Sequence, residues 1–526
     1  MQRNKGIVTY GIYFAPIIKT MQLTKKRVTL IFIFILLLAI LLRCGAMLNR
    51  SFWYDEAFSI LISEKGPQAI LAGTLTMDEP SVTADIHPPT YYFLLDGWIQ
   101  LFGTSVVATR ILSLLLGVGI LINIFLLTKE LLGVQSALLA SLGVAVFPFQ
   151  VQFATEIRMY ALLTFFLTLA TYAFIKGMRT RSWLWWGLFA LTAALAQYTQ
   201  NLAAFYLVPL ALTSLFKWDG KLLKQTVFAG LGAVLLYIPW LIHLPAQFAK
   251  IQHHYWIERP TLAVLINLLL RYTTNLPLPD QWMLPALLIA FLSIALAVLQ
   301  TLRMFRLKTQ GYKIGLWLAW LSIAPPLFLW LFSQWTPVYV DRALLASQAI
   351  FCIWLAWVLL NTSMPKVIQW TMTVILVVGV GLGLSQLATN NGYGYDPLKK
   401  VEAIISSGME PGDMVVHSNK LTYLPFFYYD PNLPMTFIGD DPGGATDTLS
   451  QATRKILGVN DSPDIESAVS GAQRIWFVIY EESVAEYVAA GYVTHAHLRY
   501  LDEHYTLNSY TSYGNVLLFQ YERKPL

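Results

Sequence analysis

Long apolar runs separated by short polar stretches make up most of this chain. A helix needs about 20 apolar residues to cross the hydrocarbon core of a bilayer, so these runs predict membrane-spanning helices. We expect eleven spans, at residues 28–48, 106–127, 133–150, 159–175, 183–197, 201–216, 226–244, 282–302, 314–333, 343–360 and 366–388. The apolar segment 261–273 is brief, which favours a helix that lies in the interface.

The pattern changes after residue 388, where ordinary mixed sequence replaces the apolar runs. Helices are expected at residues 399–407 and 482–490, and strands at 413–417, 474–480 and 516–521. Alternating helices and strands predict a small α/β domain. The fold class is therefore mostly α: a polytopic membrane helix bundle over residues 1–388, followed by a soluble α/β domain over residues 389–526. This domain either helps to bind a substrate and cover the site, or is a passive stabilising part.

Composition agrees with this division. The chain has 526 residues, of which 56% are hydrophobic and 13% are charged, whereas a soluble protein carries about 25% charged residues. Intrinsic disorder and a disulfide scaffold are excluded on the same grounds.

The charges are distributed unevenly along the chain. Residues 1–388 carry a net charge of +14 and residues 389–526 a net charge of −8, which together give the +6 of the whole chain. With a cytoplasmic N-terminus, the inner segments hold 18 basic residues and the outer loops seven. The positive-inside rule therefore predicts an inner (plasma) membrane protein with a cytoplasmic N-terminus and an extracytoplasmic C-terminal domain. The excess positive charge then faces the bilayer and the cytoplasm, and no nucleic-acid partner is expected.

The first outer loop, residues 49–105, places two carboxylates beside aromatic residues just after the first span. Asp55 and Glu56 follow Trp53 and Tyr54 directly. A carboxylate that is partly desolvated at the membrane surface becomes more basic, which suits a general base. The alternative is that Asp55 caps an interfacial helix beginning at Ala57.

The same loop contains Asp85 and His87, followed by two prolines that start a helix over residues 91–102. Two residues apart in an extended segment, their side chains share a face and could hold a cation or grip a phosphate. The alternative is that His87 only satisfies loop backbone groups. His253 belongs to an adjacent histidine pair, which is a weak indication of a metal site.

Two arginines stand at the outer ends of predicted spans, Arg158 beside Glu156 and Arg342 beside Asp341. An arginine at this depth needs a partner, either a neighbouring carboxylate or a ligand phosphate, which it can bind in a bidentate manner. The alternative is an ordinary snorkelling side chain. The predicted topology places Asp55, His87, Arg158 and Arg342 on one side of the membrane.

Four motifs together resemble the integral-membrane GT-C glycosyltransferases, in the bacterial branch that is similar to protein O-mannosyltransferases and to the lipid A aminoarabinose transferase. They are Trp53-Tyr54-Asp55-Glu56-Ala57, His87-Pro88-Pro89-Thr90-Tyr91-Tyr92, Glu156-Ile157-Arg158-Met159-Tyr160 and the segment 339–342. The resemblance covers most of residues 28–390.

The resemblance implies that a hexose or pentose moves from a polyprenyl-phosphate donor to an extracytoplasmic lipid, glycan or protein acceptor, with inversion. It implies that Asp55 is the base, and that Glu56 either orients the acceptor or supports the loop. It assigns the donor phosphate to His87, Arg158, Tyr160 and Arg342, and supporting roles to Asp85, Glu156 and Tyr339. Some members use a divalent metal ion and others do not, so no cofactor is certain; Asp85, His87 and His253 are the candidate ligands.

Three other functions stay open from the sequence, one of which is a related membrane transferase such as a polysaccharide polymerase or ligase. A transporter or lipid flippase would place polar residues in the middle of spans, whereas the notable charges here gather at the outer loops. A non-catalytic receptor or scaffold would leave the Asp, His and Arg set on one face without a purpose.

Overall fold

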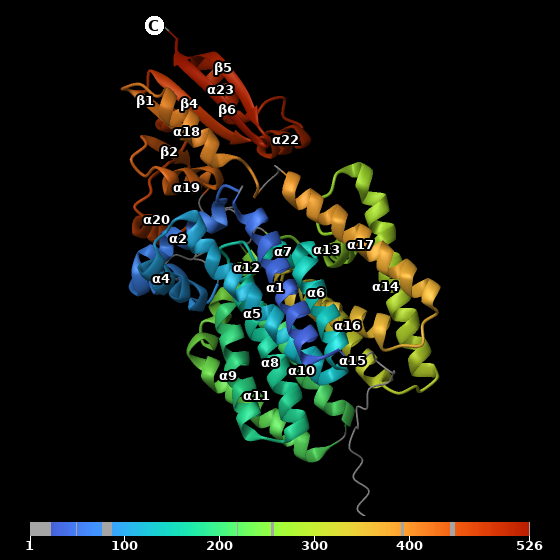
Figure 1. Cartoon of the computed structure of the whole chain (residues 1–526). Coiled ribbons are helices and arrows are strands. Elements are labelled where there is room, and N and C mark those ends of the chain that lie inside the picture. The colour runs from blue at the N-terminus through green and yellow to red at the C-terminus, as the bar shows by residue number, and fades with distance from the viewer. Residues whose placement is uncertain are drawn as a thin grey trace, which may run out of the picture.

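The computed structural model describes residues 23–48, 50–75, 87–217, 219–253, 257–390, 394–441 and 448–524. The protein is mostly helical and carries a small sheet near its C-terminus (Figure 1). Eight helices within these residues are long and apolar enough to cross a membrane: α1 (Lys25–Leu48), α5 (Val106–Leu132), α8 (Tyr160–Thr180), α11 (Gly220–Leu241), α14 (Asp280–Arg306), α15 (Tyr312–Phe332), α16 (Leu345–Leu360) with the preceding 3-10 turn η3 (Asp341–Leu344), and α17 (Lys366–Thr389).

The remaining helices of the bundle are shorter. They are α6 (Val134–Val146), α7 (Pro148–Phe153), α9 (Trp183–Thr199), η1 (Asn201–Ala203), α10 (Ala204–Leu212), η2 (Thr213–Lys217), α12 (Leu244–His253) and α13 (Leu262–Thr273). Eight of the eleven expected spans coincide with the long helices, and the other three, at 133–150, 183–197 and 201–216, fall on these shorter ones. The expectation of one continuous helix over residues 133–150 is wrong. Proline disfavours a helical conformation in the residue before it, and Phe147 is accordingly extended, so that α6 ends there and α7 starts with Pro148.

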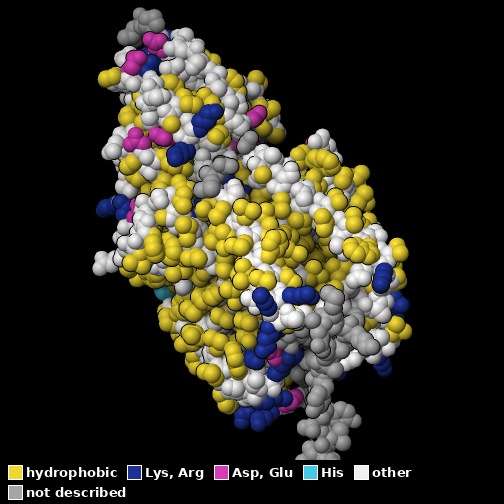
Figure 2. Space-filling model, viewed as in Figure 1, with side chains coloured by type: hydrophobic (Ala, Val, Ile, Leu, Met, Phe, Trp, Pro, Cys, Tyr) yellow, Lys and Arg dark blue, Asp and Glu magenta, His cyan; other side chains and the backbone are white. Residues whose placement is uncertain are grey.

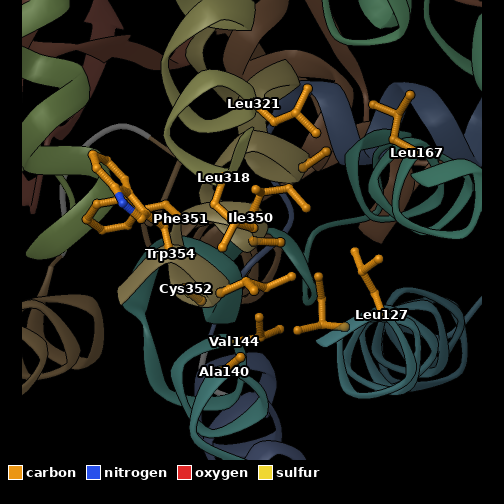
Figure 3. Packing of buried hydrophobic residues seen from close by; sticks show 14 of the residues in the cluster. Leu127, Ala140, Val144, Leu167, Leu318, Leu321, Ile350, Phe351, Cys352 and Trp354 are labelled. Carbon is orange, nitrogen blue, oxygen red and sulfur yellow. The ribbon is translucent and has the colours of Figure 1, made fainter. Parts of the chain in front are cut away.

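Helix α16 lies at the centre of the bundle and is buried along almost its whole length. Figure 3 shows its residues Ile350, Cys352 and Trp354 packed among Leu127 and Leu318 of neighbouring helices. Helices α1, α14 and α17 are peripheral, and many of their large apolar side chains are exposed. Such apolar surfaces are what a helix presents to lipid.

The first outer loop forms three helices, α2 (Tyr54–Glu64), α3 (Gly66–Leu75) and α4 (Thr90–Phe102). In Figure 1, α2 and α4 lie beside the end of the bundle that is nearest the C-terminal part. Helix α4 buries Tyr91 and Tyr92, while Leu101 and Phe102 at its end are exposed. One face of α4 therefore belongs to the core and its end is apolar and uncovered, as in a helix at the membrane interface.

The C-terminal part is a six-stranded sheet in the order β3-β2-β1-β4-β6-β5. Strands β1 to β4 pair in parallel, and β5 and β6 are antiparallel. The elements are α18 (Leu398–Gly408), β1 (Asp413–His417), α19 (Lys420–Tyr429), β2 (Met435–Ile438), α20 (Gln451–Leu457), β3 (Asp461–Ser462), α21 (Ile465–Ala468), β4 (Arg474–Tyr480), α22 (Glu481–Ala489), α23 (Ala496–His504), β5 (Tyr505–Tyr513) and β6 (Val516–Arg523). The five elements expected from the sequence all occur. The central strand β4 is buried on both faces, since Phe477 packs in one apolar cluster and Val478 in another.

Helix α19 joins this sheet to the first outer loop. The Tyr429 hydroxyl accepts a hydrogen bond from the Phe52 backbone N–H at 2.7 Å, and the Tyr428 hydroxyl donates to the Thr104 carbonyl at 2.8 Å. The Phe52 and Tyr428 rings meet edge to face at 4.7 Å. Phe52, on the loop, and Leu424, on α19, belong to one hydrophobic cluster. The C-terminal part is thus packed directly against the segment that carries Asp55.

Figure 2 shows a broad hydrophobic surface over the bundle, with Lys and Arg side chains gathered at the end farthest from the sheet. At this end Glu130 pairs with Lys176 at 3.5 Å and with Arg179 at 2.7 Å. The bundle therefore has one basic end, and the opposite end carries the outer-loop helices and the sheet.

Candidate active site

Asp55 and Glu56 both lie in the first turn of α2. The helix begins at Tyr54, with Trp53 at its N-cap position. The alternative in which Asp55 caps a helix starting at Ala57 is therefore wrong. Because residues 55 and 56 are about 100° apart around the helix, their carboxylates point in different directions. Each carboxylate contacts a different set of partners.

The Asp55 carboxylate lies between two guanidinium groups. Its Oδ2 atom is 3.6 Å from Arg158 Nε and 3.5 Å from Arg342 Nη1. The side chain of Asp55 remains 19% exposed, whereas that of Arg158 is 6% exposed. The distances are those of ion pairs and are longer than good hydrogen bonds. The carboxylate thus keeps an open side from which a ligand can approach.

Each of the two arginines is held in place by other contacts. Arg158 Nη1 donates to Ser59 Oγ at 3.2 Å and to the Tyr92 hydroxyl at 3.4 Å. The guanidinium of Arg342 lies over the Trp53 ring at 5.4 Å and over the Tyr160 ring at 5.2 Å. These cation–π contacts stabilise the partly buried positive charge of Arg342 and do not neutralise it.

Glu56 forms a buried ion pair with an arginine that is not among the predicted site residues. Arg110 donates through Nε to Glu56 Oε1 at 3.2 Å and through Nη2 to Oε2 at 2.7 Å. The Ile157 backbone N–H also donates to Glu56 Oε1, at 3.0 Å. Both side chains of the pair are 2% exposed. Arg110 further donates to the carbonyls of Met47, Arg50 and Ser51.

This clamp ties the end of α1, the start of α2, helix α5 and the loop of Arg158 together. It holds the backbone on which Asp55 and Arg158 stand. Of the two roles open for Glu56 from the sequence, this geometry favours support of the loop.

Glu156 starts a chain of polar contacts that leads to Arg342. Gln152 donates to Glu156 Oε1 at 3.2 Å and accepts from Asn275 at 2.8 Å. Arg271 donates to Asn275 at 3.1 Å and, through Nε, to Asp341 Oδ2 at 2.7 Å. Asp341 in turn accepts from the Arg342 backbone N–H at 2.8 Å. Burial raises the pKa of Glu156 to about 7, against the opposing effect of the Arg342 charge.

The other predicted residues are placed less closely. His87 stands just before α4, the helix that carries Tyr92. The hydroxyl of Tyr339 is buried and has no hydrogen-bond partner within the described residues. Asp85 lies outside the described residues, and His253 ends α12. Across the described parts of the chain, no three His, Cys, Asp or Glu side chains gather closely enough to hold a metal ion.

Four residues that complete the site were not singled out from the sequence for it: Arg110, Gln152, Arg271 and Asn275. Arg110 lies inside an expected span. An arginine at that depth needs a partner, so its position could have indicated a site residue, as it did for Arg158. Gln152 and Asn275 gave no such signal, because neutral amides are common in loops and nothing in their spacing joins them.

Three comparisons relate this arrangement to known proteins. Residues 86–243 match the family described as dolichyl-phosphate-mannose-protein mannosyltransferase. YkcB of Bacillus subtilis, whose name assigns it to the mannosyltransferases, is 31% identical over 184 residues, which are 34% of this chain and 24% of YkcB. This chain therefore matches about a quarter of the length of that relative.

Solved structures match over much more of the chain. ArnT from Cupriavidus metallidurans aligns with a TM-score of 0.60 at 12% identity, over 93% of this chain and 97% of ArnT. The chain therefore shares the fold of ArnT over nearly its whole length. ArnT bound to undecaprenyl phosphate aligns with a TM-score of 0.57 over the same shares. The oligosaccharyltransferase of Archaeoglobus fulgidus, a longer protein, aligns with a TM-score of 0.50 at 11% identity, over 95% of this chain and 74% of that one.

Proposed function

We propose that this protein transfers a sugar from a polyprenyl-phosphate donor to an extracytoplasmic lipid, glycan or protein acceptor, with inversion at the anomeric carbon. One observation carries the proposal: the Asp55 carboxylate lies between the guanidinium groups of Arg158 and Arg342, at 3.6 and 3.5 Å. A base beside two fixed cations is what a reaction with a phosphate leaving group requires.

The residues divide the work as follows. Arg158 and Arg342 bind the donor phosphate, with Tyr160 and His87 beside them. The acceptor O–H or N–H group attacks the anomeric carbon, the bond from that carbon to the phosphate oxygen breaks, and Asp55 takes the acceptor proton. Polyprenyl phosphate leaves with the bonding electron pair, and the arginines stabilise its growing negative charge. Glu56, Glu156 and Tyr339 support these groups.

The comparisons support a lipid-linked donor, because ArnT has been solved with undecaprenyl phosphate bound. The proposed orientation rests on charge. Basic side chains gather at the end of the bundle farthest from the sheet (Figure 2), and that end is cytoplasmic by the positive-inside rule. We place residues 1–388 in the inner membrane, with the catalytic loop 49–105 outside, and residues 389–526 as an extracytoplasmic domain.

Replacing Asp55 by asparagine tests the base. The expected result for Asp55→Asn is a loss of sugar transfer of about 10² to 10⁴-fold, while the purified protein still binds the donor. Transfer is measured with a radiolabelled polyprenyl-phosphate sugar and membranes that supply the acceptor. Glu130→Gln is the matched control, since Glu130 pairs with Lys176 and Arg179 at the other end of the bundle. Normal transfer by Asp55→Asn would refute the assignment, and donor movement without any transfer by the wild type would favour a flippase.

Replacing Arg342 by lysine tests the phosphate clamp. Lysine keeps the charge but loses the planar, two-pronged group. A charged hydrogen bond contributes about 1.5–3 kcal/mol, so donor KM should rise roughly 10- to 100-fold in Arg342→Lys. The control is Arg179→Lys, at the opposite end. An unchanged donor KM and kcat would contradict phosphate binding by Arg342.

A further inference from the structure

A cleft of about 790 Å³ opens where the outer loop, the start of α5 and the C-terminal part meet. Its walls include Glu64, Lys65, Thr104, Val107, Lys399 and Tyr428. A volume of this size accommodates a molecule rather than a single ion. None of these six residues binds the donor or takes the acceptor proton in the proposed transfer.

The cleft is separate from the candidate active site. Asp55 and Glu64 lie nine residues apart on α2, which is two and a half turns and roughly 13 Å along the axis. Their side chains therefore leave opposite sides of the helix. Asp55 faces Arg158 on one side, and the cleft lies on the other.

Both signs of charge line the cleft. Among the described residues, the ammonium groups of Lys65 and Lys399 have no carboxylate within ion-pair distance. The first turn of α5 adds the positive end of a 27-residue helix, at Val106 and Val107, where backbone N–H groups favour an anion. Glu64 adds a negative charge. Burial and then the Glu64 charge raise the pKa of Tyr428, which also lines the cleft, to about 12.

Exposed apolar side chains lie on residues next to the cleft. Leu101 is 77% exposed, Phe102 57% and Val107 44%. Further along α5, Leu115, Ile122 and Leu126 are also exposed. Positions 115, 122 and 126 lie seven and four residues apart, so they form a stripe along one side of this membrane-spanning helix. A lipid chain can lie against such a stripe.

We propose that this cleft binds the head group of an aminophospholipid of the phosphatidylethanolamine type. The phosphate lies between Lys65, Lys399 and the start of α5, the primary amine pairs with Glu64, and the acyl chains follow the stripe on α5. A mixed-charge pocket complements a head group that carries both signs, and it disfavours one that is only negative. Such a lipid links the C-terminal part, through Lys399, to the outer-loop helices. The proposal does not depend on the transfer reaction.

Native mass spectrometry of the full-length protein tests the proposal. The protein is reconstituted with equal amounts of dioleoyl phosphatidylethanolamine, phosphatidylglycerol and phosphatidylcholine, and the retained lipids are counted. Phosphatidylethanolamine should be enriched in the wild type. At about fivefold for each lysine near a phosphate, Lys65→Ala/Lys399→Ala should lower its retention roughly 25-fold. The matched control is Lys400→Ala, because Lys400 is the next residue but lies over the Tyr513 ring at 5.6 Å.

Two further variants sharpen the result. Val107→Trp fills the cleft without changing charge, and should abolish the enrichment. Glu64→Gln removes the partner of the amine, and should move the preference toward phosphatidylglycerol. Equal retention of the three lipids by the wild type, or an equal loss in Lys400→Ala and in the double variant, would overturn the proposal. In every variant, unchanged sugar transfer is expected, which keeps this test distinct from that of the proposed function.

Discussion

The charges around Asp55 do not cancel. One carboxylate faces two guanidinium groups, at 3.6 and 3.5 Å, which leaves an excess of positive charge where Arg342 also stacks on two aromatic rings. In a site that is partly shielded from water this excess attracts an anion. When a phosphate also pairs with Arg158 and Arg342, the electrostatic attraction between these arginines and Asp55 becomes weaker. In the proposed function, donor binding would in this way prepare the Asp55 carboxylate to accept a proton.

Glu156 gives a prediction about pH. Burial raises its pKa to about 7 from the ordinary value of 4.5. The folded protein then keeps a proton that the unfolded chain releases near pH 4.5. The free energy of unfolding should therefore fall as the pH rises from about 4.5 to about 7 and be level above that. At pH 8, Glu156→Gln should be more stable than the wild type, by up to about 3 kcal/mol.

The measurement is thermal unfolding in detergent at pH 5 and pH 8. The gain of Glu156→Gln should disappear at pH 5, because the wild-type carboxyl is then protonated and resembles the amide. Glu402→Gln serves as the control, since Glu402 is on α18 and bonds the nearby exposed Ser406 hydroxyl. Equal melting temperatures for wild type and Glu156→Gln at both pH values would contradict the prediction.

At the residue scale, the sequence singled out Asp55, Arg158 and Arg342 as candidates, because each is a charge at the end of an apolar run. The sequence could not show which residues hold these three side chains in place. Arg110 and Glu56 are 54 positions apart, and the bond between them exists only once α2 folds back onto α5. The polar chain from Glu156 to Arg342 likewise crosses three separate segments.

At the scale of elements, the Glu56–Arg110 pair should be needed for folding. Removing one partner of a buried ion pair leaves an uncompensated charge and costs about 3–5 kcal/mol. Arg110→Met and Glu56→Gln should therefore each lower the unfolding temperature strongly. The double variant Glu56→Leu/Arg110→Met should recover part of the loss, because no charge is left buried. Thermal unfolding of detergent-purified protein measures all three.

The control for this cycle is the exposed pair of Arg181 and Asp219, whose side chains are 33% and 37% exposed. Arg181→Met should cost no more than about 1 kcal/mol. If Arg110→Met were as mild as Arg181→Met, the clamp would not hold the outer loop.

The elements themselves were largely predictable, since apolar runs of membrane length and a strand such as 474–480 carry strong periodic signals. The division of residues 133–150 was missed although Pro148 marks it. Strand β5 was missed because most of its residues are exposed, so its sequence lacks the alternation that reveals a half-buried strand. The short strand β2 owes its place to pairing with β1, and β3 owes its place to pairing with β2.

At the scale of the whole molecule, the loop that carries Asp55 and the C-terminal part share one core. Phe52, Tyr91 and Phe149 pack in the same cluster as Tyr423 and Leu457. A change in composition marked residue 389 as a boundary, yet composition cannot show that two parts of different character pack together. The outer loop has the bundle on one side and α19 on the other, so both determine where Asp55 lies.

The bond from Phe52 to Tyr429 tests this coupling. Tyr429→Phe leaves the Phe52 backbone N–H buried without its partner at 2.7 Å, which costs about 1–3 kcal/mol. Because Phe52 is three residues before Asp55, the loss should lower both the unfolding temperature and kcat, while donor KM changes less. Tyr510→Phe, on the exposed strand β5, removes the same hydroxyl from a side chain that is 53% exposed and should change neither. If Tyr429→Phe lowered the unfolding temperature with normal kcat, the C-terminal part would stabilise the fold without positioning the base. If both were unchanged, the contact would contribute to neither, and Asp55 would be held by the bundle alone.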